Sequence, residues 1–218
     1  MPGVVDGNGL VKRSTLLGWR NVDVRTPIER RFSLPVTVNN DATAAMFTER
    51  LFGKGGPSMM FVRLRRGVGG AVLLGDVPVF GENHAGGEIG HISLDPQGPP
   101  CACGKRGCLE RLVSATSLHA RLQRSDERMR ASILREAGTY LGTALSMPVG
   151  LLDLADVCVY GQSDIVNDTL LSAAQAQLDL LTGSSFHTRT IIRRCECEGE
   201  ITLRGEALSV LHDYLENR

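Results

Sequence analysis

The chain has 218 residues, of which 42% are hydrophobic, and its 24 basic side chains balance 24 acidic ones. This length and apolar content predict one sizeable domain, or one full lobe with a piece of another. The zero net charge argues against a nucleic-acid-binding domain, which usually carries a basic excess on one face. Because the sequence has no run of about 18 apolar residues and no amino-terminal signal peptide, we expect a cytoplasmic protein without membrane contact.

The first part of the chain is predicted to contain a hairpin, a strand and a helix. Residues 1–19 are rich in glycine and are typical of strand ends that lead into a loop at Trp19. The β-branched run at 36–38 predicts a strand. Asn40 or Asp41 is expected to cap a helix that continues through the alanine-rich stretch after it.

Gly53 is expected to end this helix, and the Lys-Gly-Gly-Pro sequence at 54–57 marks an expected lobe boundary. Two apolar runs follow, at 58–64 and 69–75, and they predict buried strands around a glycine-rich turn. A local basic cluster lies at the end of the first run and in the turn, and we interpret it as solvated surface side chains; its members are Arg63, Arg65 and Arg66.

The segment 75–106 shows little periodicity and is expected to be mostly loop. Ser114 is a good cap for a helix to about residue 124. Apolar residues at helical spacing predict a long helix over 127–153, which Pro148 is expected to kink or split. The remaining predicted elements are a strand at 156–161, a helix at 164–181, a strand at 188–195 and a helix at 205–217. Strands that alternate with helices indicate an α/β protein.

One histidine and three cysteines have the spacing of a metal site. Cys101, Cys103 and Cys108 follow His91 at +10, +12 and +17, with glycines and prolines between them for tight turns. One imidazole and three thiolates form a closed tetrahedral set that favours zinc. Such a site has no open position for a substrate, so its expected role is structural. The alternative is three buried free cysteines beside an unrelated histidine.

The other three cysteines are expected to bind no metal. Cys158 lies in an apolar strand and is predicted to be part of the core. Cys195 and Cys197 form a second Cys-x-Cys pair but have no nearby histidine or third thiol. Three disulfides would require a secreted protein, which the missing signal peptide disfavours.

Four stretches carry a resemblance to a known family. The cysteine segment AGGEIGHISLDPQGPPCACGKRGCLE (85–110) is the most specific, and PGVVD with LGW, PVTVNNDATAA and GVGGAVLLGDVPVFG precede it in order. Over roughly the first 120 residues the chain resembles the ROK family of repressors, uncharacterised reading frames and sugar kinases. Beyond that the likeness is weaker and rests on LLDLADVCVYG and GEAL.

The resemblance implies an actin-like ATPase (ribonuclease H-like) fold with a sugar between two lobes. Residues 1–57 would be a remnant of the amino-terminal lobe. Residues 58–218 would form the carboxy-terminal lobe with the zinc loop, and the last helix is expected to return to the first lobe.

The resemblance also assigns roles to individual residues. The expected zinc ligands are His91, Cys101, Cys103 and Cys108, and the expected sugar contacts are Gly3, Asn40, Asp41, Glu88, His91 and Glu110. His91 would bind zinc through one ring nitrogen and a sugar hydroxyl through the other. In a kinase, Asp41 would be the general base. The alternatives are that Asn40 and Asp41 only cap a helix and that the two glutamates are surface acids.

The chain departs from the family pattern where the family binds nucleotide. The early phosphate-binding turn and the winged helix-turn-helix of repressor members have no counterpart in the sequence given. Arg65 and Arg66 stand where small residues are usual, Gly161-Gln162 replaces a Gly-Gly pair, and Asn39 stands where an acid is common. The nucleotide site that remains, at Gly67, Gly69 and Gly161, is therefore degenerate.

These departures favour a sugar-responsive transcriptional regulator, represented by its effector-binding and oligomerisation portion. One alternative is an ATP-dependent glucose or aminosugar kinase, which would need ATP and Mg²⁺; another is a non-catalytic remnant. Expected partners are a small sugar or aminosugar and further copies of the chain in a homodimer or homotetramer. The chain alone is not expected to bind DNA specifically, because it has no candidate recognition helix and no net positive charge.

Overall fold

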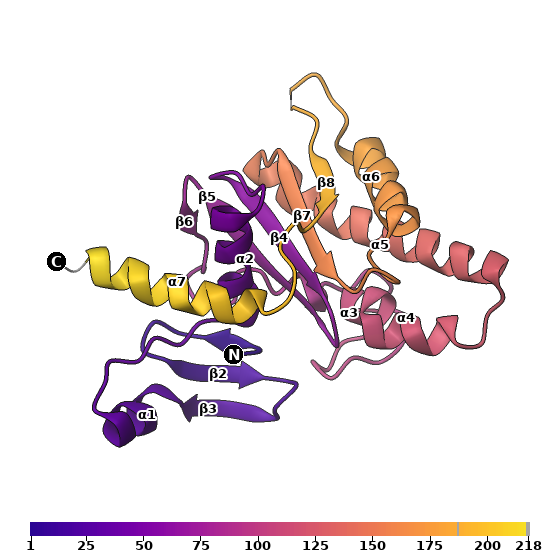
Figure 1. Ribbon diagram of the computed structural model, residues 1–218. Helices are drawn as coiled ribbons and strands as arrows, with labels where there is room; N and C mark the ends of the chain where they lie inside the picture. Colours follow the sequence, from indigo (N-terminus) through magenta and orange to yellow (C-terminus); the bar gives the residue numbers. More distant parts are fainter. Residues whose placement is uncertain (187, 217–218) are drawn as a thin grey trace.

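A five-stranded mixed sheet lies at the centre of the computed structural model, which describes residues 1–186 and 188–216 (Figure 1). Its strand order is β6-β5-β4-β7-β8, with β6, β5 and β4 antiparallel and β4, β7 and β8 parallel. A tight turn allows the first pairing, whereas the parallel pairings follow helical crossovers. The strands are β4 (Met59–Leu64), β5 (Val68–Leu74), β6 (Val77–Pro78), β7 (Asp156–Gly161) and β8 (Ile191–Arg194).

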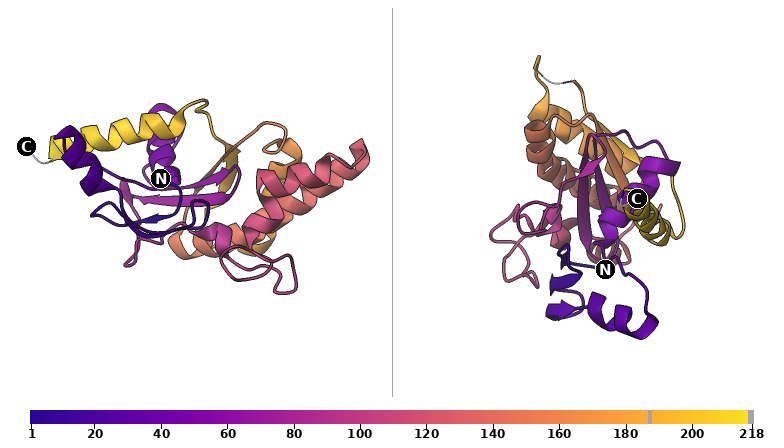
Figure 2. Two further views of the ribbon diagram at one scale, coloured as in Figure 1. Left: turned by 90° about the horizontal axis from the view of Figure 1, so that it is seen from below. Right: turned by 90° about the vertical axis from the view of Figure 1, so that its left-hand side faces the viewer.

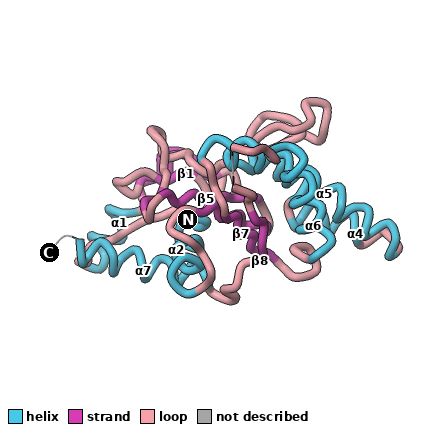
Figure 3. Tube along the Cα trace, turned by 90° about the horizontal axis from the view of Figure 1, so that it is seen from above, coloured by secondary structure: helices cyan, strands magenta, loops and turns pink. Residues whose placement is uncertain are grey.

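Helices cover both faces of this sheet. In Figure 3 the strands run between α2 and α7 on one side and α4, α5 and α6 on the other. The helices are α1 (Arg25–Phe32), α2 (Asp41–Phe52), α3 (Leu109–Val113), α4 (Ala115–Leu122), α5 (Glu127–Leu152), α6 (Asp168–Thr182) and α7 (Ile201–Glu216), with a short 3-10 turn, η1 (Ile89–His91). None of the described helices is both long and apolar enough to cross a membrane.

Alternation along β4 divides the core into two layers. Met60 and Val62 point toward α3–α6, whereas Met59 and Phe61 pack against α2 and the start of α7. All four side chains are fully buried. A central strand that is apolar on both faces is expected when helices cover both sides of a sheet.

A second, smaller sheet lies at one end of the larger one, together with α1 (Figure 2). Its antiparallel strands are β1 (Val4–Val5), β2 (Leu10–Ser14) and β3 (Trp19–Asp23). Met1 joins it to the start of α2, because its carbonyl accepts a hydrogen bond from the amide of Asp41 (3.0 Å). Gly3 has φ +105°, and a side chain there would collide with the backbone at Arg13. Glycine therefore lets β1 approach β2 closely.

Two expectations for local structure are wrong, and one helix was not predicted. Trp19 begins β3 and pairs with Ser14, because Gly18 at φ +67° turns the chain before it. Residues 36–38 form no strand, and the Val36 amide donates to the Glu29 carboxylate instead (3.2 Å). The sequence also gave no signal for α1, in which no residue is buried.

Pro148 does not split the long helix. α5 continues from Glu127 to Leu152 with the proline inside it. Leu145 and Val149, on either side of Pro148, are both buried in the core, so packing holds the helix although one amide hydrogen bond is lost.

The predicted helix starts are confirmed where a side chain caps them. The Asn40 side chain accepts from the amides of Ala42 and Thr43, and Ser114 accepts from the amide of Ser117. The last helix begins at Ile201, four residues earlier than predicted, and residue 217 of that prediction lies outside the described part of the chain. α7 packs along α2; the division into two lobes at residue 57 stays a prediction.

Two glycines allow α5 and α6 to pack closely. A side chain at Gly138 would collide with the carbonyl of Leu170, and one at Gly142 with the carbonyl of Ala174. Both carbonyls belong to the backbone of α6, so they cannot move aside as a flexible side chain can. The Gly-x-x-x-Gly spacing thus sets the distance between the two helices.

Gly142→Ala is expected to lower the free energy of unfolding by about 1–3 kcal/mol, the usual cost of overpacking a core. Gly150→Ala is the matched control, because it lies in the same helix and faces open space. It should leave stability unchanged or raise it by up to about 1 kcal/mol. Urea unfolding followed by circular dichroism measures both, and equal shifts in the two variants would contradict the close-packing role.

Candidate functional site

The segment from His91 to Cys108 is a folded loop whose two ends meet. Ser93 and Cys108 pair as an antiparallel bridge. Gly107 has φ +57°, and a side chain there would collide with the backbone of Asp95. Glycine at this point therefore allows the two arms of the loop to close on each other.

The closed loop brings together all four predicted metal ligands. The Cys101 Sγ and His91 Nδ1 atoms are 3.6 Å apart, as are the Sγ atoms of Cys103 and Cys108, and all four ligand atoms lie within 4.8 Å of one another. In a tetrahedral zinc site, bonds of about 2.3 Å to sulfur and about 2.0 Å to nitrogen place neighbouring ligand atoms about 3.5–3.8 Å apart. The cluster could hold a metal ion, and its dimensions and donor atoms fit zinc.

His91 links this cluster to a neighbouring carboxylate. Its Nδ1 faces Cys101, whereas its Nε2 lies 3.9 Å from the Oε2 atom of Glu88. Burial raises the pKa of Glu88, and the nearby carboxylates of Glu110 and Asp41 raise it further, against the effect of His91. A carboxylate next to the second nitrogen of a ligating histidine orients the ring.

Asn40 and Asp41 stand at the start of α2. The Asn40 amide oxygen caps the helix, and its nitrogen donates to the carbonyl of Gly3 (2.9 Å). This bond uses one of its two N–H groups. Asp41 lies in the first turn, and its Oδ2 atom accepts from the Arg63 guanidinium at 2.8 Å. The helix cap is real, and it also brings both side chains beside Gly3.

Glu110 reaches the turn between β4 and β5 from the start of α3. Its Oε2 atom accepts a hydrogen bond from the Val68 amide (3.2 Å). A side chain at Gly67 would lie 2.5 Å from this carboxylate oxygen. A side chain at position 67 would therefore require the Glu110 carboxylate to move.

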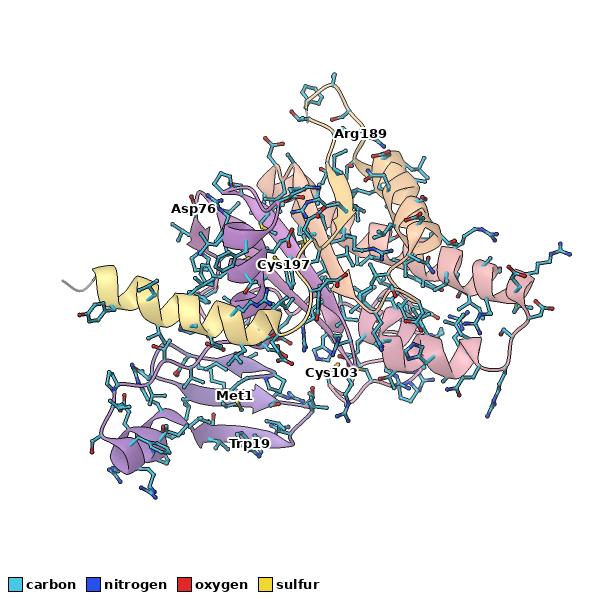
Figure 4. The ribbon with its side chains drawn as sticks, in the orientation of Figure 1. Met1, Trp19, Asp76, Cys103, Arg189 and Cys197 are labelled. Carbon is cyan, nitrogen blue, oxygen red and sulfur yellow. The ribbon has the colours of Figure 1, made fainter. Side chains whose placement is uncertain are left out.

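All six predicted sugar contacts line one cavity of about 460 Å³. Two of the predicted nucleotide residues, Gly67 and Gly69, line it as well, whereas Gly161 is not part of the described lining and packs against Leu64 and Val166. The cavity lies between the small sheet, the start of α2, the β4–β5 turn and the cysteine loop. Figure 4 shows Cys103 at the lower end of the larger sheet, close to the small sheet.

The sequence did not indicate several residues of the cavity wall. They are Pro2, Ser14, Thr15, Leu16, Arg63, Val68 and Ala102. Arg63 had a usable signal, because it follows Met59 and Phe61 at the alternation of β4 and breaks an otherwise apolar face. Arg65 and Arg66 are exposed, as expected, but they face the cavity mouth rather than bulk surface alone.

A second group of potential ligands lies in the core, away from the cavity. Atoms of Glu49, Cys158 and Cys195 come within 4.8 Å of one another. The Glu49 carboxylate pairs with Arg193 at 2.5 Å and also accepts from the Cys195 thiol and the Cys197 amide. Because Arg193 already supplies the positive charge, we interpret this group as a structural network.

The sequence matches the ROK family over residues 1–145. A xylose repressor from Bacillus subtilis is 30% identical over 131 residues, which are 59% of this chain and 34% of the repressor. A glucokinase from Halalkalibacterium halodurans is 38% identical over 121 residues, which are 54% of this chain and 37% of the kinase. The matched segment thus spans about a third of the length of these relatives.

A solved structure shares the fold over nearly the whole chain. The ROK family glucokinase from Streptomyces griseus, in complex with glucose and AMPPNP, superposes with a TM-score of 0.83 at 23% identity over 95% of this chain and 78% of the kinase chain. Together with the strand order and the helices on both faces, this defines an actin-like ATPase fold, as the resemblance predicted. The chain belongs to the ROK family.

Proposed function

We propose that this chain is the sugar-binding portion of a ROK-family transcriptional regulator, stabilised by a structural zinc. The observation that carries the proposal is the ion pair between Arg63 and Asp41 in the cavity. This ion pair engages the carboxylate that a kinase would use as its base. The other expected sugar contacts still line the same cavity. Both classes of relative, repressors and glucokinases, are compatible with such a cavity.

The cavity residues would hold a sugar through its hydroxyl groups. The carboxylates of Glu88 and Glu110 supply acceptors, and the Asn40 amide keeps one N–H group to donate. Hydrogen bonds to charged groups are among the stronger ones in proteins. The cavity volume of about 460 Å³ lies within the usual range of small-ligand sites.

The zinc would be held by His91, Cys101, Cys103 and Cys108. When bound, it balances the thiolate charge and closes the loop. The Nε2 side of His91 then stays next to Glu88 on the cavity wall. Loop order and the sugar site are therefore coupled through one imidazole ring.

Phosphoryl transfer would need a free base and a cradle for the nucleotide phosphates. Asp41 has its Oδ2 atom engaged by Arg63, and the Val68 amide at the phosphate-side turn is engaged by Glu110. Arg65 and Arg66 add bulk where the chain of phosphates would approach. The kinase alternative rests on Asp41 itself, which lines the cavity in the position that the family resemblance assigns to a base.

We expect the chain to bind a sugar without turning it over. Titration calorimetry with hexoses, pentoses and aminosugars measures binding, and a coupled assay with ATP and Mg²⁺ measures phosphoryl transfer. Sugar-dependent turnover that disappears in Asp41→Asn but persists in Glu82→Gln, an exposed acid outside the cavity, would establish the kinase instead. Absence of any sugar binding would favour the non-catalytic remnant.

The same proposal places the protein in the cytoplasm as a homodimer or homotetramer. It assigns no specific DNA binding to this chain alone. With a net charge of zero, contacts to DNA phosphates would be weak and would weaken further with salt.

A further inference from the structure

Three arginines of the β4–β5 hairpin line the cavity: Arg63 in β4, and Arg65 and Arg66 in the turn. They stand among three carboxylates of the same cavity, those of Asp41, Glu88 and Glu110. Of the three arginines, Arg63 forms an ion pair with one of these carboxylates, Asp41. Positive charge is therefore in local excess at the turn, where Arg65 and Arg66 lie.

Arg63 has most of its hydrogen-bonding capacity unused. A guanidinium carries five N–H donors, and among the described residues one of them is used, from Nη1 to Asp41 at 2.8 Å. Its Nε has no partner among the described residues, but it is buried, so the donors that a ligand could reach are those of the two outer nitrogens. The ion pair thus fixes the side chain in the cavity wall while leaving donors for a further acceptor.

Arg65 and Arg66 have no carboxylate within ion-pair distance among the described residues. The Arg65 guanidinium lies over the ring of Tyr160, 5.8 Å from its centre. The backbone of the turn is anchored to α4, since the Arg65 carbonyl accepts from the Ala115 amide and the Arg66 carbonyl from the Thr116 hydroxyl. Two unpaired cations are therefore held on a fixed turn at the cavity.

The backbone of this turn is not free to bind an anion in the usual glycine-rich manner. Glu110 occupies the space beside Gly67 and accepts the Val68 amide. An anion here would be recognised by guanidinium groups, which match phosphate and carboxylate with paired hydrogen bonds. Arg63 places this positive region next to Asp41 and Asn40, at the residues proposed to hold the sugar.

We propose that the ligand of this cavity is an anionic sugar, whose phosphate or carboxylate group contacts Arg63, Arg65 and Arg66. This rests on the proposed sugar-binding function and adds the charge of the ligand. The sugar ring would lie against Glu88, His91 and Glu110, and its charged end would point toward Asp41 and the β4–β5 turn. Asp41 then acts as the partner that orients Arg63.

The test compares neutral and anionic forms of the same sugar by titration calorimetry on the whole chain. The probes are glucose, glucose 6-phosphate, glucuronate, N-acetylglucosamine and its 6-phosphate, with ADP and inorganic phosphate as separate arms. We expect at least one anionic sugar to bind 10-fold or more tightly than its neutral parent, by a ratio that falls as salt is raised. Phosphate and carboxylate arms distinguish a sugar phosphate from a sugar acid.

The double variant Arg65→Ser and Arg66→Ser should bring this ratio close to one. Arg128→Ser, an exposed arginine of α5 outside the cavity, should keep it. Neutral sugars that bind as well as the anionic ones would overturn the inference and leave the sugar-binding function standing. Binding of ADP without preference for an anionic sugar would assign the arginines to a nucleotide, which also overturns it. Failure of every sugar to bind would refute the proposed function and this inference together.

Discussion

Cys103→Ser is expected to lose the bound metal and, with it, at least about 100-fold in sugar affinity. Cys103 approaches Cys108 at 3.6 Å in the four-residue cluster, and a serine hydroxyl is a poor substitute for a thiolate on a soft metal. The loop between Ser93 and Pro100 has no fully buried apolar side chain to order it. A 100-fold loss equals about 2.7 kcal/mol, which is the backbone ordering cost of only two or three residues at about 1 kcal/mol each.

The loss of the metal should lower sugar affinity although the metal would touch no sugar atom. His91 belongs to both, since its two ring nitrogens face Cys101 and Glu88. Elemental analysis should find one zinc per wild-type chain and none in the variant. Treatment of the wild type with a chelator should reproduce the loss of binding.

Cys158→Ser is the matched control for this prediction. Cys158 is buried on the opposite face of β7 from the larger core layer and does not line the cavity. Its replacement should leave zinc content and sugar affinity within a factor of a few of the wild type. If Cys103→Ser binds sugar as tightly as the wild type does, the metal and sugar sites are independent.

Structural features that are set by residues close together in the sequence could be predicted from the sequence. The loop ligands lie within 18 consecutive residues, so their spacing alone indicates a common site. Asn40 and Ser114 signal helix starts because their side chains bond amides two or three residues on. The order of strands and helices likewise follows from periodicity and turn residues, which is why the α/β class could be inferred.

Features that depend on pairing across the chain were not predictable in this way. Residues 36–38 have the β-branched composition of a strand, but a strand also needs a partner, and none is described. Arg63 breaks the apolar alternation of β4 in the sequence, but its partner Asp41 is evident only once β4 is placed beside α2. The second cysteine pair is similar, because its meaning depends on Glu49, which lies about 146 residues earlier in the chain.

Glu49→Gln is expected to lower the free energy of unfolding by about 3 kcal/mol at neutral pH, the upper end of the usual cost of leaving a buried hydrogen-bond donor without an acceptor. The Glu49 carboxylate is fully buried. One of its oxygens accepts from Arg193 and the Lys54 amide, the other from the Cys195 thiol and the Cys197 amide. A glutamine would present an N–H group to one of these sets of donors, so at least one donor would lose its acceptor.

The cost should depend on pH in a defined direction. Burial alone would raise the pKa of Glu49, but the hydrogen bonds from Cys195, Arg193 and the two amides outweigh it and hold the pKa below its ordinary value of 4.5. A carboxyl whose pKa is lowered by folding stabilises the folded state above its unfolded pKa, and that stabilisation is lost as the pH falls through the folded pKa. The difference between wild type and Glu49→Gln should therefore be constant near pH 7 and shrink below about pH 4.5.

Urea unfolding at a series of pH values measures this difference, with Glu196→Gln as the control. Glu196 is an acid of the same segment, but its pair with Lys54 is largely exposed, and such pairs contribute at most about 1 kcal/mol. Arg193 lies 2.8 Å from Asp156 and keeps this partner in the Glu49 variant. A large loss of stability would therefore come from the donors around position 49 that lack an acceptor, and not from an arginine without a counter-charge. A Glu49→Gln variant no less stable than Glu196→Gln would mean that these hydrogen bonds do not hold β8 and residues 195–197 against α2.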